Sequence, residues 1–160
     1  MRALIARLFT RAEPVVSEAA VRDAASFAAL HGASFRRGWT EDEFERLLAE
    51  RSVIAHQARN GRALAGFILS RIASGEAEIL SVAVDRSRRG RGLARRLLEL
   101  HLRRLAGLAV ATVFLEVDDD NVLAQRLYAR AGFREVGRRA GYYPRPSGSA
   151  GAALVLRRDL

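Results

Sequence analysis

The sequence predicts an α/β fold in which helices flank a mixed, mostly antiparallel sheet. Three runs of strand-forming residues follow one another in the middle of the chain and are joined by short turns. A strand–helix–strand unit comes next, and such a connection is right-handed and makes its two strands parallel. With 160 residues, 49% of them hydrophobic, the chain is expected to bury one core as a single domain over residues 1–160.

Two helices are expected before the first strand. The first covers residues 18–33, where apolar side chains recur in an alanine-rich stretch. The second begins after Thr40 and runs through residues 44–48, because Thr40 and Glu43 have the spacing of a capping box. Residues 1–12 are expected to be flexible. They make a poor signal peptide, since Arg7 interrupts their apolar run and no small-residue cleavage site follows.

The strands are expected over residues 52–58, 63–72 and 77–84. Asn60-Gly61 separates the first two, and this dipeptide between apolar runs is a strong hairpin signal. The remaining elements are a helix over 92–105, a strand over 110–117, a helix over 121–131 that ends at Gly132, and strands over 133–143 and 152–157. Pro, Gly and Ser dominate residues 144–151, which predicts a loop.

Composition excludes several classes of function. The chain has no cysteine, so disulfides, thiolate nucleophiles and cysteine-based zinc sites are ruled out, and three scattered histidines predict no metal site. No apolar stretch approaches the ~20 residues of a membrane helix, so we expect a cytoplasmic protein with no membrane contact. The net charge is +9, and every basic residue is arginine. That excess attracts polyanions, although arginine-rich codon usage would produce it as well.

The segment between the strand at 77–84 and the following helix is rich in glycine and arginine. Its arginines are Arg86, Arg88, Arg89 and Arg91. Glycine lets the backbone approach a ligand closely, and the start of a helix presents unpaired N–H groups and the positive end of its dipole. The pattern therefore predicts a site for a pyrophosphate, with a basic surface loop as the alternative.

Glu116 is an acidic residue in an otherwise apolar strand. Alternation places it on the face of Phe114, away from Leu115 and Val117. Carboxylates are rarely placed in such strands without a partner or a chemical task, and a partly desolvated carboxylate is suited to general-base catalysis. The alternative is a strand-end glutamate with its carboxylate in solvent.

Two polar residues share one face of the helix over 121–131. Asn121 and Tyr128 are seven positions apart, which is about two helical turns. The Tyr128 hydroxyl could donate a proton to a leaving group, or the ring could simply pack on the sheet. Asn121 could equally be the N-cap of the helix.

Taken together, these motifs resemble the GNAT N-acetyltransferases. Val82-Ala83-Val84 precedes Arg89 to Ala94, which match the family signature [Q/R]-x-x-G-x-[G/A], with Arg89 in place of the commoner Gln and Ala94 in place of the second Gly. The spacing is similar to that of the ribosomal-protein-alanine N-acetyltransferase branch. The segments that carry this likeness are 115–117, Asn121, 127–128, 131–133 and Tyr142-Tyr143-Pro144. The resemblance extends from Trp39 to the C-terminus.

The resemblance implies a GNAT fold with a splayed pair of parallel strands, acetyl-CoA as cosubstrate and no metal. It implies that the backbone of Val82, Ala83 and Val84 binds pantetheine. It implies that the pyrophosphate is held around Arg89 by the amides of Gly90, Arg91, Gly92, Leu93, Ala94 and Arg95, with Asn121 as a further contact. Glu116 matches the general base and Tyr128 the general acid, while Trp39, Tyr142 and Tyr143 correspond to the acceptor site.

The implied acceptor is the α-amine of a protein N-terminus, with the N-terminal alanine of ribosomal protein S18 as the usual target. Asp118, Asp119 and Asp120 are candidates to recognise a basic peptide, or they form a solvated loop. Gly141 and residues 151–154 depart from the branch pattern, which leaves a polyamine, an aminoglycoside or a lysine side chain as alternative acceptors.

A non-catalytic, RNA-associated module is disfavoured because no aromatic residues accompany the arginine cluster. We expect no direct nucleic-acid role and a monomer or weak oligomer.

Overall fold

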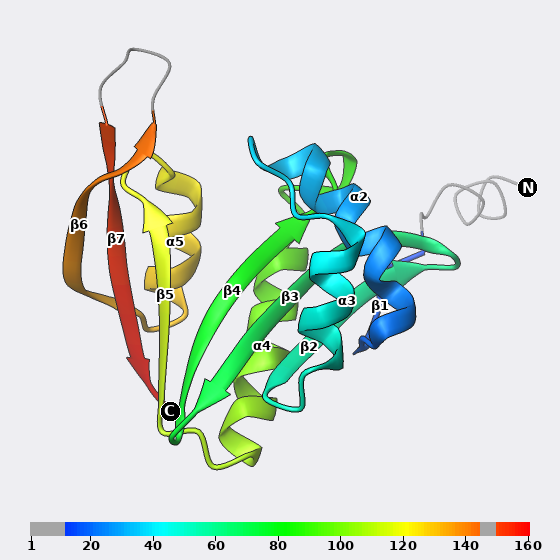
Figure 1. The fold of residues 1–160 in the computed structure, drawn as a ribbon, viewed down its shortest axis with the longest axis horizontal. Helices are drawn as coiled ribbons and strands as arrows, with labels where there is room; N and C mark the ends of the chain where they lie inside the picture. The colour runs from blue at the N-terminus through cyan, green and yellow to red at the C-terminus, as the bar shows by residue number, and fades with distance from the viewer. Residues whose placement is uncertain (1–11, 145–149) are drawn as a thin grey trace, which may run out of the picture.

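The computed structural model describes residues 12–144 and 150–160, and the side chains of 12–141 and 151–160. One seven-stranded sheet, in the order β1-β2-β3-β4-β5-β7-β6, forms its centre (Figure 1). The strands are β1 (Val15–Glu18), β2 (Val53–Asn60), β3 (Ala63–Ala73), β4 (Glu76–Val84), β5 (Thr112–Asp118), β6 (Arg134–Pro144) and β7 (Ala150–Asp159). The helices are α2 (Ala24–Ser34), α3 (Glu41–Ala49), α4 (Leu93–Gly107) and α5 (Val122–Arg130), with short 3₁₀ turns η1 (Val21–Asp23) and η2 (Arg86–Arg88).

The expected fold class is confirmed. β4 and β5 are parallel and are joined through α4, while every other neighbouring pair of strands is antiparallel. No helix in the described ranges is long and apolar enough to cross a membrane. The expected flexibility of residues 1–12 concerns residues that lie, except for Ala12, outside the described ranges. Residues 145–149 of the expected loop are also outside them, but the loop prediction is wrong at its ends, because Pro144 belongs to β6 and Ala150 and Gly151 to β7.

The prediction of a helix over residues 18–33 is wrong at its start. Val15–Glu18 is instead the edge strand β1, with Glu18 opposite His56 of β2, and α2 begins only at Ala24. Asp23 fixes this boundary, because its carboxylate accepts hydrogen bonds from the Ala20 amide, 2.9 Å, and from Arg59, 3.1 Å. Tertiary pairing with β2 therefore overrides the helix propensity of the alanine-rich sequence.

Local signals place most other boundaries correctly. The capping box of α3 is present: the Glu43 amide donates to Thr40 Oγ1, 3.2 Å, and the Thr40 amide to Glu43 Oε2, 2.7 Å. This exchange lowers the pKa of the Glu43 carboxyl. Gly61 turns the β2–β3 hairpin with a φ of 58°, and Gly132 ends α5 with a φ of 86°. Both values lie in the left-handed region that glycine adopts without strain.

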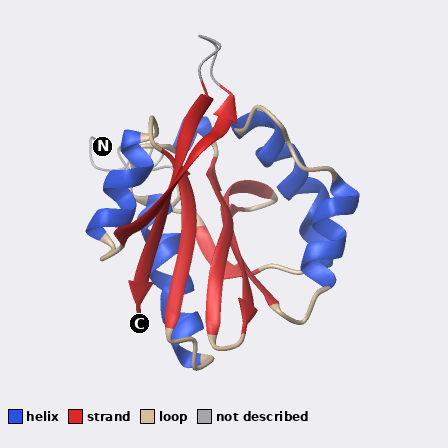
Figure 2. Cartoon of the chain, turned by 60° about the vertical axis from the view of Figure 1, so that its left-hand side comes forward, coloured by secondary structure: helices blue, strands red, loops and turns tan. Residues whose placement is uncertain are grey.

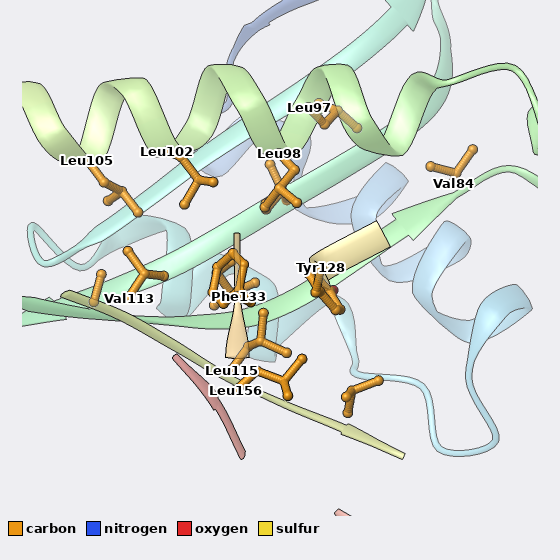
Figure 3. Packing of buried hydrophobic residues seen from close by; sticks show 14 of the residues in the cluster. Val84, Leu97, Leu98, Leu102, Leu105, Val113, Leu115, Tyr128, Phe133 and Leu156 are labelled. Carbon is orange, nitrogen blue, oxygen red and sulfur yellow. The ribbon is translucent and has the colours of Figure 1, made fainter. Parts of the chain in front are cut away.

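Helices cover both faces of the sheet (Figure 2). On the face of β2–β4, α2 and α3 bury an aromatic cluster in which Phe27 stacks on Phe67 with ring centroids 4.3 Å apart. On the other face, α4 packs against β2, β3 and β4, and α5 contributes Tyr128 to the same core. This second core includes Leu97, Leu98, Leu102, Leu105, Val113, Leu115, Tyr128, Phe133 and Leu156 (Figure 3).

A buried polar network lies under α4. His101 Nδ1 is 2.8 Å from His56 Nδ1, and its Nε2 is 2.6 Å from Ser70 Oγ. Burial lowers the pKa of His101 to about 3, so this ring stays neutral and can both donate and accept one hydrogen bond. The network joins α4 to β2 and β3, so His101 has a structural role inside the protein.

Candidate functional site

The central feature of the site is a parting of the two parallel strands. β4 and β5 pair only from Glu76 opposite Thr112 to Ile79 opposite Leu115. Beyond that point, residues 80–84 and 116–118, all within the described part of the chain, do not pair with each other. Figure 1 shows the two strands meeting at their lower ends and diverging towards their tips. One backbone edge of β4 is therefore left available to a ligand.

A bulge in β4 lies where the strands part. Leu69 pairs with Ser81 and Ser70 with Ile79, so Leu80 is an extra residue in β4 relative to β3. A bulge of this kind bends the strand and increases its twist. The other edge of β4 stays paired with β3 as far as Val84. The segment Val82, Ala83 and Val84 is thus anchored on one side and open on the other.

The glycine- and arginine-rich loop follows β4 directly and is held by its own polar groups. The Asp85 carboxylate accepts from the Ser87 amide, 2.8 Å, and hydroxyl, 2.6 Å. Arg89 Nε donates to the Val84 carbonyl at 3.0 Å, which ties the loop back to the end of the strand. This contact confines the loop next to the open edge of β4.

Gly90 and Gly92 give the loop its shape, with φ values of 73° and 78°. A Cβ atom at either position would meet nothing within 4 Å, so packing does not explain the glycines, whereas the backbone conformation does. Gly92 caps α4 without a side-chain hydrogen bond, and the first helical bond runs from the Arg96 amide to the Gly92 carbonyl, 3.1 Å. The preceding amides, of Leu93, Ala94 and Arg95, therefore remain for an anion.

Glu116 lies on β5, just past the parting of the strands. Its face is that of Phe114, opposite the core positions Leu115 and Val117, as alternation predicts. Its side chain is only 21% exposed, and Oε1 is 2.9 Å from Arg139 Nη2 of β6. The alternative of a glutamate with its carboxylate free in solvent is therefore wrong, because the carboxylate has a cationic partner.

Tyr128 approaches the same region from the opposite face of β5. Its ring is buried in the core under α4, edge-on to Phe133 with centroids 5.7 Å apart (Figure 3). Burial raises the pKa of Tyr128 to about 12, so the phenol keeps its proton at neutral pH. Glu116 and Tyr128 thus stand on the two sides of the β5 tip, one suited to accept a proton and the other to donate one.

Asn121 and Trp39 both have structural partners. Asn121 Oδ1 accepts from the Ala124 amide at 3.2 Å and so caps α5. The Trp39 amide donates to His31 Nδ1, 3.0 Å, and its ring stacks on His31 at 4.5 Å. Burial lowers the pKa of His31 to about 4, which keeps Nδ1 an acceptor. The packing and capping roles are confirmed, and ligand contacts by either residue remain predictions.

The acidic segment after Glu116 is partly engaged by the protein itself. Asp118 Oδ1 accepts from the Asp120 amide at 2.9 Å, and Asp119 is 3.8 Å from Arg138 Nη1. These contacts are those of a capped loop. Tyr142 and Tyr143 belong to β6 by their backbone, but their side chains lie outside the described residues, so their expected role is untested.

Arg139 is the residue of this site that sequence reasoning missed. Arginines are frequent in the chain, and no motif distinguishes this one. It reaches Glu116 only because β6 and β5 both pair with β7, in the registers Arg139 opposite Ala153 and Glu116 opposite Val155. Only the pairing of these three strands would have identified Arg139 as the partner of Glu116, and local sequence does not encode that pairing.

Comparisons with known proteins agree with this geometry. Residues 20–133 match the model of the acetyltransferase (GNAT) family. The [ribosomal protein bS18]-alanine N-acetyltransferase of Escherichia coli K12 is 34% identical over 117 residues, 73% of this chain and 78% of that protein. The N-alpha-acetyltransferase RimI of Mycobacterium tuberculosis is 38% identical over 125 residues, covering 76% and 75% of the two chains.

The fold comparison gives the same result. The crystal structure of the E. coli ribosomal-protein-S18-alanine N-acetyltransferase superposes with a TM-score of 0.85 at 27% identity, over 91% of this chain and 93% of that one. A family match over most of the chain, two relatives above 30% identity and the parted β4–β5 pair lead to one conclusion: the chain belongs to the GNAT acetyltransferase family.

Proposed function

We propose that this protein transfers the acetyl group of acetyl-CoA to the α-amine of a protein N-terminus. The observation that carries the proposal is the open edge of β4, with the glycine loop at its end and Glu116 and Tyr128 on either side of the β5 tip. Donor binding, base and acid then meet at one place.

The donor-binding residues fit an extended molecule that combines amides with a pyrophosphate. The free edge of Val82, Ala83 and Val84 offers backbone donors and acceptors to the amides of the pantetheine arm. The amides of residues 90–95 and the dipole of α4 would hold the pyrophosphate. A pocket of about 180 Å³ beside this loop is lined by three arginines and one acidic residue, Glu13, which pairs with Arg96, so Arg88 and Arg91 leave the lining with a net positive charge. Bound acetyl-CoA would supply the activated thioester.

Glu116 would act on the acceptor. An α-amine has a pKa near 8, so at neutral pH most of it is protonated and cannot attack a carbonyl carbon. Glu116, directly or through one water, takes that proton and frees the nitrogen lone pair. The amine then forms the new C–N bond while the C–S bond breaks, and a backbone N–H of β4 stabilises the charge on the carbonyl oxygen.

Tyr128 would protonate the leaving group and regain a proton from the amine nitrogen as the amide forms, while Glu116 releases its proton to solvent. Its phenol keeps its proton well above neutral pH, so the hydroxyl is available to protonate the departing CoA thiolate. No covalent enzyme intermediate is required, which suits a chain without cysteine. Asn121, at the start of α5, would contact the cofactor in addition to capping the helix.

The acceptor is proposed to be a protein that begins with alanine, such as ribosomal protein S18. The support is that the E. coli relative is named for the bS18 alanine and the M. tuberculosis relative is named an N-alpha-acetyltransferase. Trp39, Tyr142 and Tyr143 would line the acceptor path. A small-molecule amine or a lysine side chain is the alternative acceptor.

The test is CoA release with acetylation verified by mass. The acceptors are an Ala-Arg peptide with a free α-amine, the same peptide blocked at that amine, a blocked peptide that contains lysine, and spermidine. We expect acetylation only of the free α-amine. Turnover on spermidine or on the lysine side chain, with none on the free α-amine, would overturn the proposed acceptor while leaving the family assignment unaffected.

A further inference from the structure

The Glu116–Arg139 ion pair places a positive charge where the proposed reaction brings another. Arg139 Nη2 is 2.9 Å from Glu116 Oε1, which is within the range of a charge-assisted hydrogen bond. The proposed acceptor also approaches Glu116 as a cation, because its α-amine is mostly protonated at neutral pH. The carboxylate is only 21% exposed, so few approaches to it are open.

The strand registers explain how Arg139 reaches this position. Antiparallel neighbours directly opposite each other point to the same face of a sheet. Glu116 lies opposite Val155 and Arg139 opposite Ala153, so both side chains emerge on one face, on either side of β7. Residue 137, opposite Val155 on β6, is glycine and contributes no side chain. Ala153 and Val155 of β7 lie between Arg139 and Glu116, and the long arginine side chain crosses over them.

The two ends of this ion pair differ in their surroundings. The Glu116 side chain is largely enclosed, whereas the Arg139 side chain is 58% exposed. The guanidinium is thus the more hydrated partner of the pair, and water can solvate it when it leaves Glu116. A second cation arriving while the first remains would be repelled by it, because like charges a few ångströms apart interact unfavourably in a partly enclosed site.

We propose that Arg139 is a positioning residue that occupies the ammonium site of Glu116 until the acceptor α-amine displaces it. The guanidinium orients the carboxylate in the resting enzyme. The incoming ammonium exchanges with it, so acceptor binding is a competition between two cations for one carboxylate. This inference rests on the proposed function, because it requires a protonated α-amine at Glu116.

The experiment measures peptide affinity by calorimetry with CoA bound, so that no acetyl transfer occurs. In Arg139→Gln we expect the dissociation constant of a free α-amine Ala-Arg peptide to fall about three- to tenfold, because the competing cation is absent. Arg139→Lys retains the cation and should stay close to the wild type. The matched control is Arg138→Gln, a neighbouring change of the same charge, since Arg138 pairs with Asp119 and Glu135 instead.

The peptide blocked at its α-amine distinguishes exchange from general electrostatics. Loss of one positive charge from a basic protein strengthens binding of any basic peptide. Exchange of Arg139 with the acceptor ammonium predicts instead that affinity rises only for the peptide with a free α-amine. Unchanged or weaker binding in Arg139→Gln would overturn the inference, and so would an equal gain with the blocked peptide or in Arg138→Gln. Wild-type protein that neither binds nor acetylates any free α-amine peptide would overturn the proposed function itself, and the exchange with it.

Discussion

The proposed donor side and the proposed acceptor side of this site are built in different ways. The donor side is contiguous: Val82 to Val84, the loop and the first turn of α4 follow one another, and backbone amides are the proposed binding groups. The acceptor side is assembled from strands that meet only in the folded sheet, with Glu116 on β5 and Arg139 on β6 separated by β7. A backbone site tolerates many side chains, whereas an assembled site depends on individual ones.

The largest expected effect is on the acceptor side, from Glu116→Gln. Removing the base should lower kcat by about 10²- to 10⁴-fold, because the amide cannot accept the ammonium proton. Acetyl-CoA affinity, measured by calorimetry, should be unchanged. Glu76→Gln at the opposite end of β4 is the control, and comparable activity in the two variants would remove Glu116 from the mechanism.

The proposed acid on the cofactor-facing side of β5 should give the next effect. Tyr128→Phe retains the buried ring and its edge-on contact with Phe133 but lacks the proton, so kcat should fall about 10²-fold. Because the pKa of Tyr128 is raised to about 12, the wild-type rate should show no loss from Tyr128 ionisation up to about pH 10. Steady-state rates across pH for both proteins test this, and a fully active Tyr128→Phe would leave the tyrosine with packing alone.

A donor-side change should act on acetyl-CoA alone. Gly92→Ala strains a residue with φ of 78° and adds a methyl group where the phosphates are proposed to bind, so KM for acetyl-CoA should rise about tenfold, equivalent to 1.4 kcal/mol. Peptide affinity should not change. Gly75→Ala is the matched control, because Gly75 has φ of 76°, equally open space and a position at the far end of β4. An equal rise in both variants would attribute the effect to backbone strain.

The buried histidines should make stability, rather than activity, depend on pH. Burial lowers the pKa of His31 to about 4 and of His101 to about 3, so below pH 6.5 the unfolded chain binds protons that the folded chain does not. The free energy of unfolding should therefore fall as the pH drops from 6.5 towards 4, by up to about 1.4 kcal/mol per pH unit for each proton. Urea unfolding at several pH values measures this slope.

One variant measures how much His31 contributes to the pH dependence of stability. His31→Asn retains an acceptor for the Trp39 amide but does not titrate, so its stability should depend less steeply on pH than that of the wild type. Equal slopes would show that His31 contributes nothing to the pH dependence of stability.

The amino-acid sequence by itself determined the features that are local in the chain. The capping box of α3, the Asn-Gly hairpin, the glycine loop at the start of α4 and the alternation that turns Glu116 away from the core are all set by neighbouring residues. Each depends on backbone preference or side-chain periodicity over a few positions, which is why the fold class and most of the candidate site could be predicted.

The tertiary structure decided what depends on strands far apart in sequence. Residues 15–18 became a strand because β2 presented an edge to pair with, although the alanine-rich sequence beside them favours helix. Arg139 became the partner of Glu116 because β7 sets the register of both its neighbours. Strand register is fixed by hydrogen bonds and packing between distant segments, and a shift of one residue would have turned Arg139 to the opposite face, away from the carboxylate.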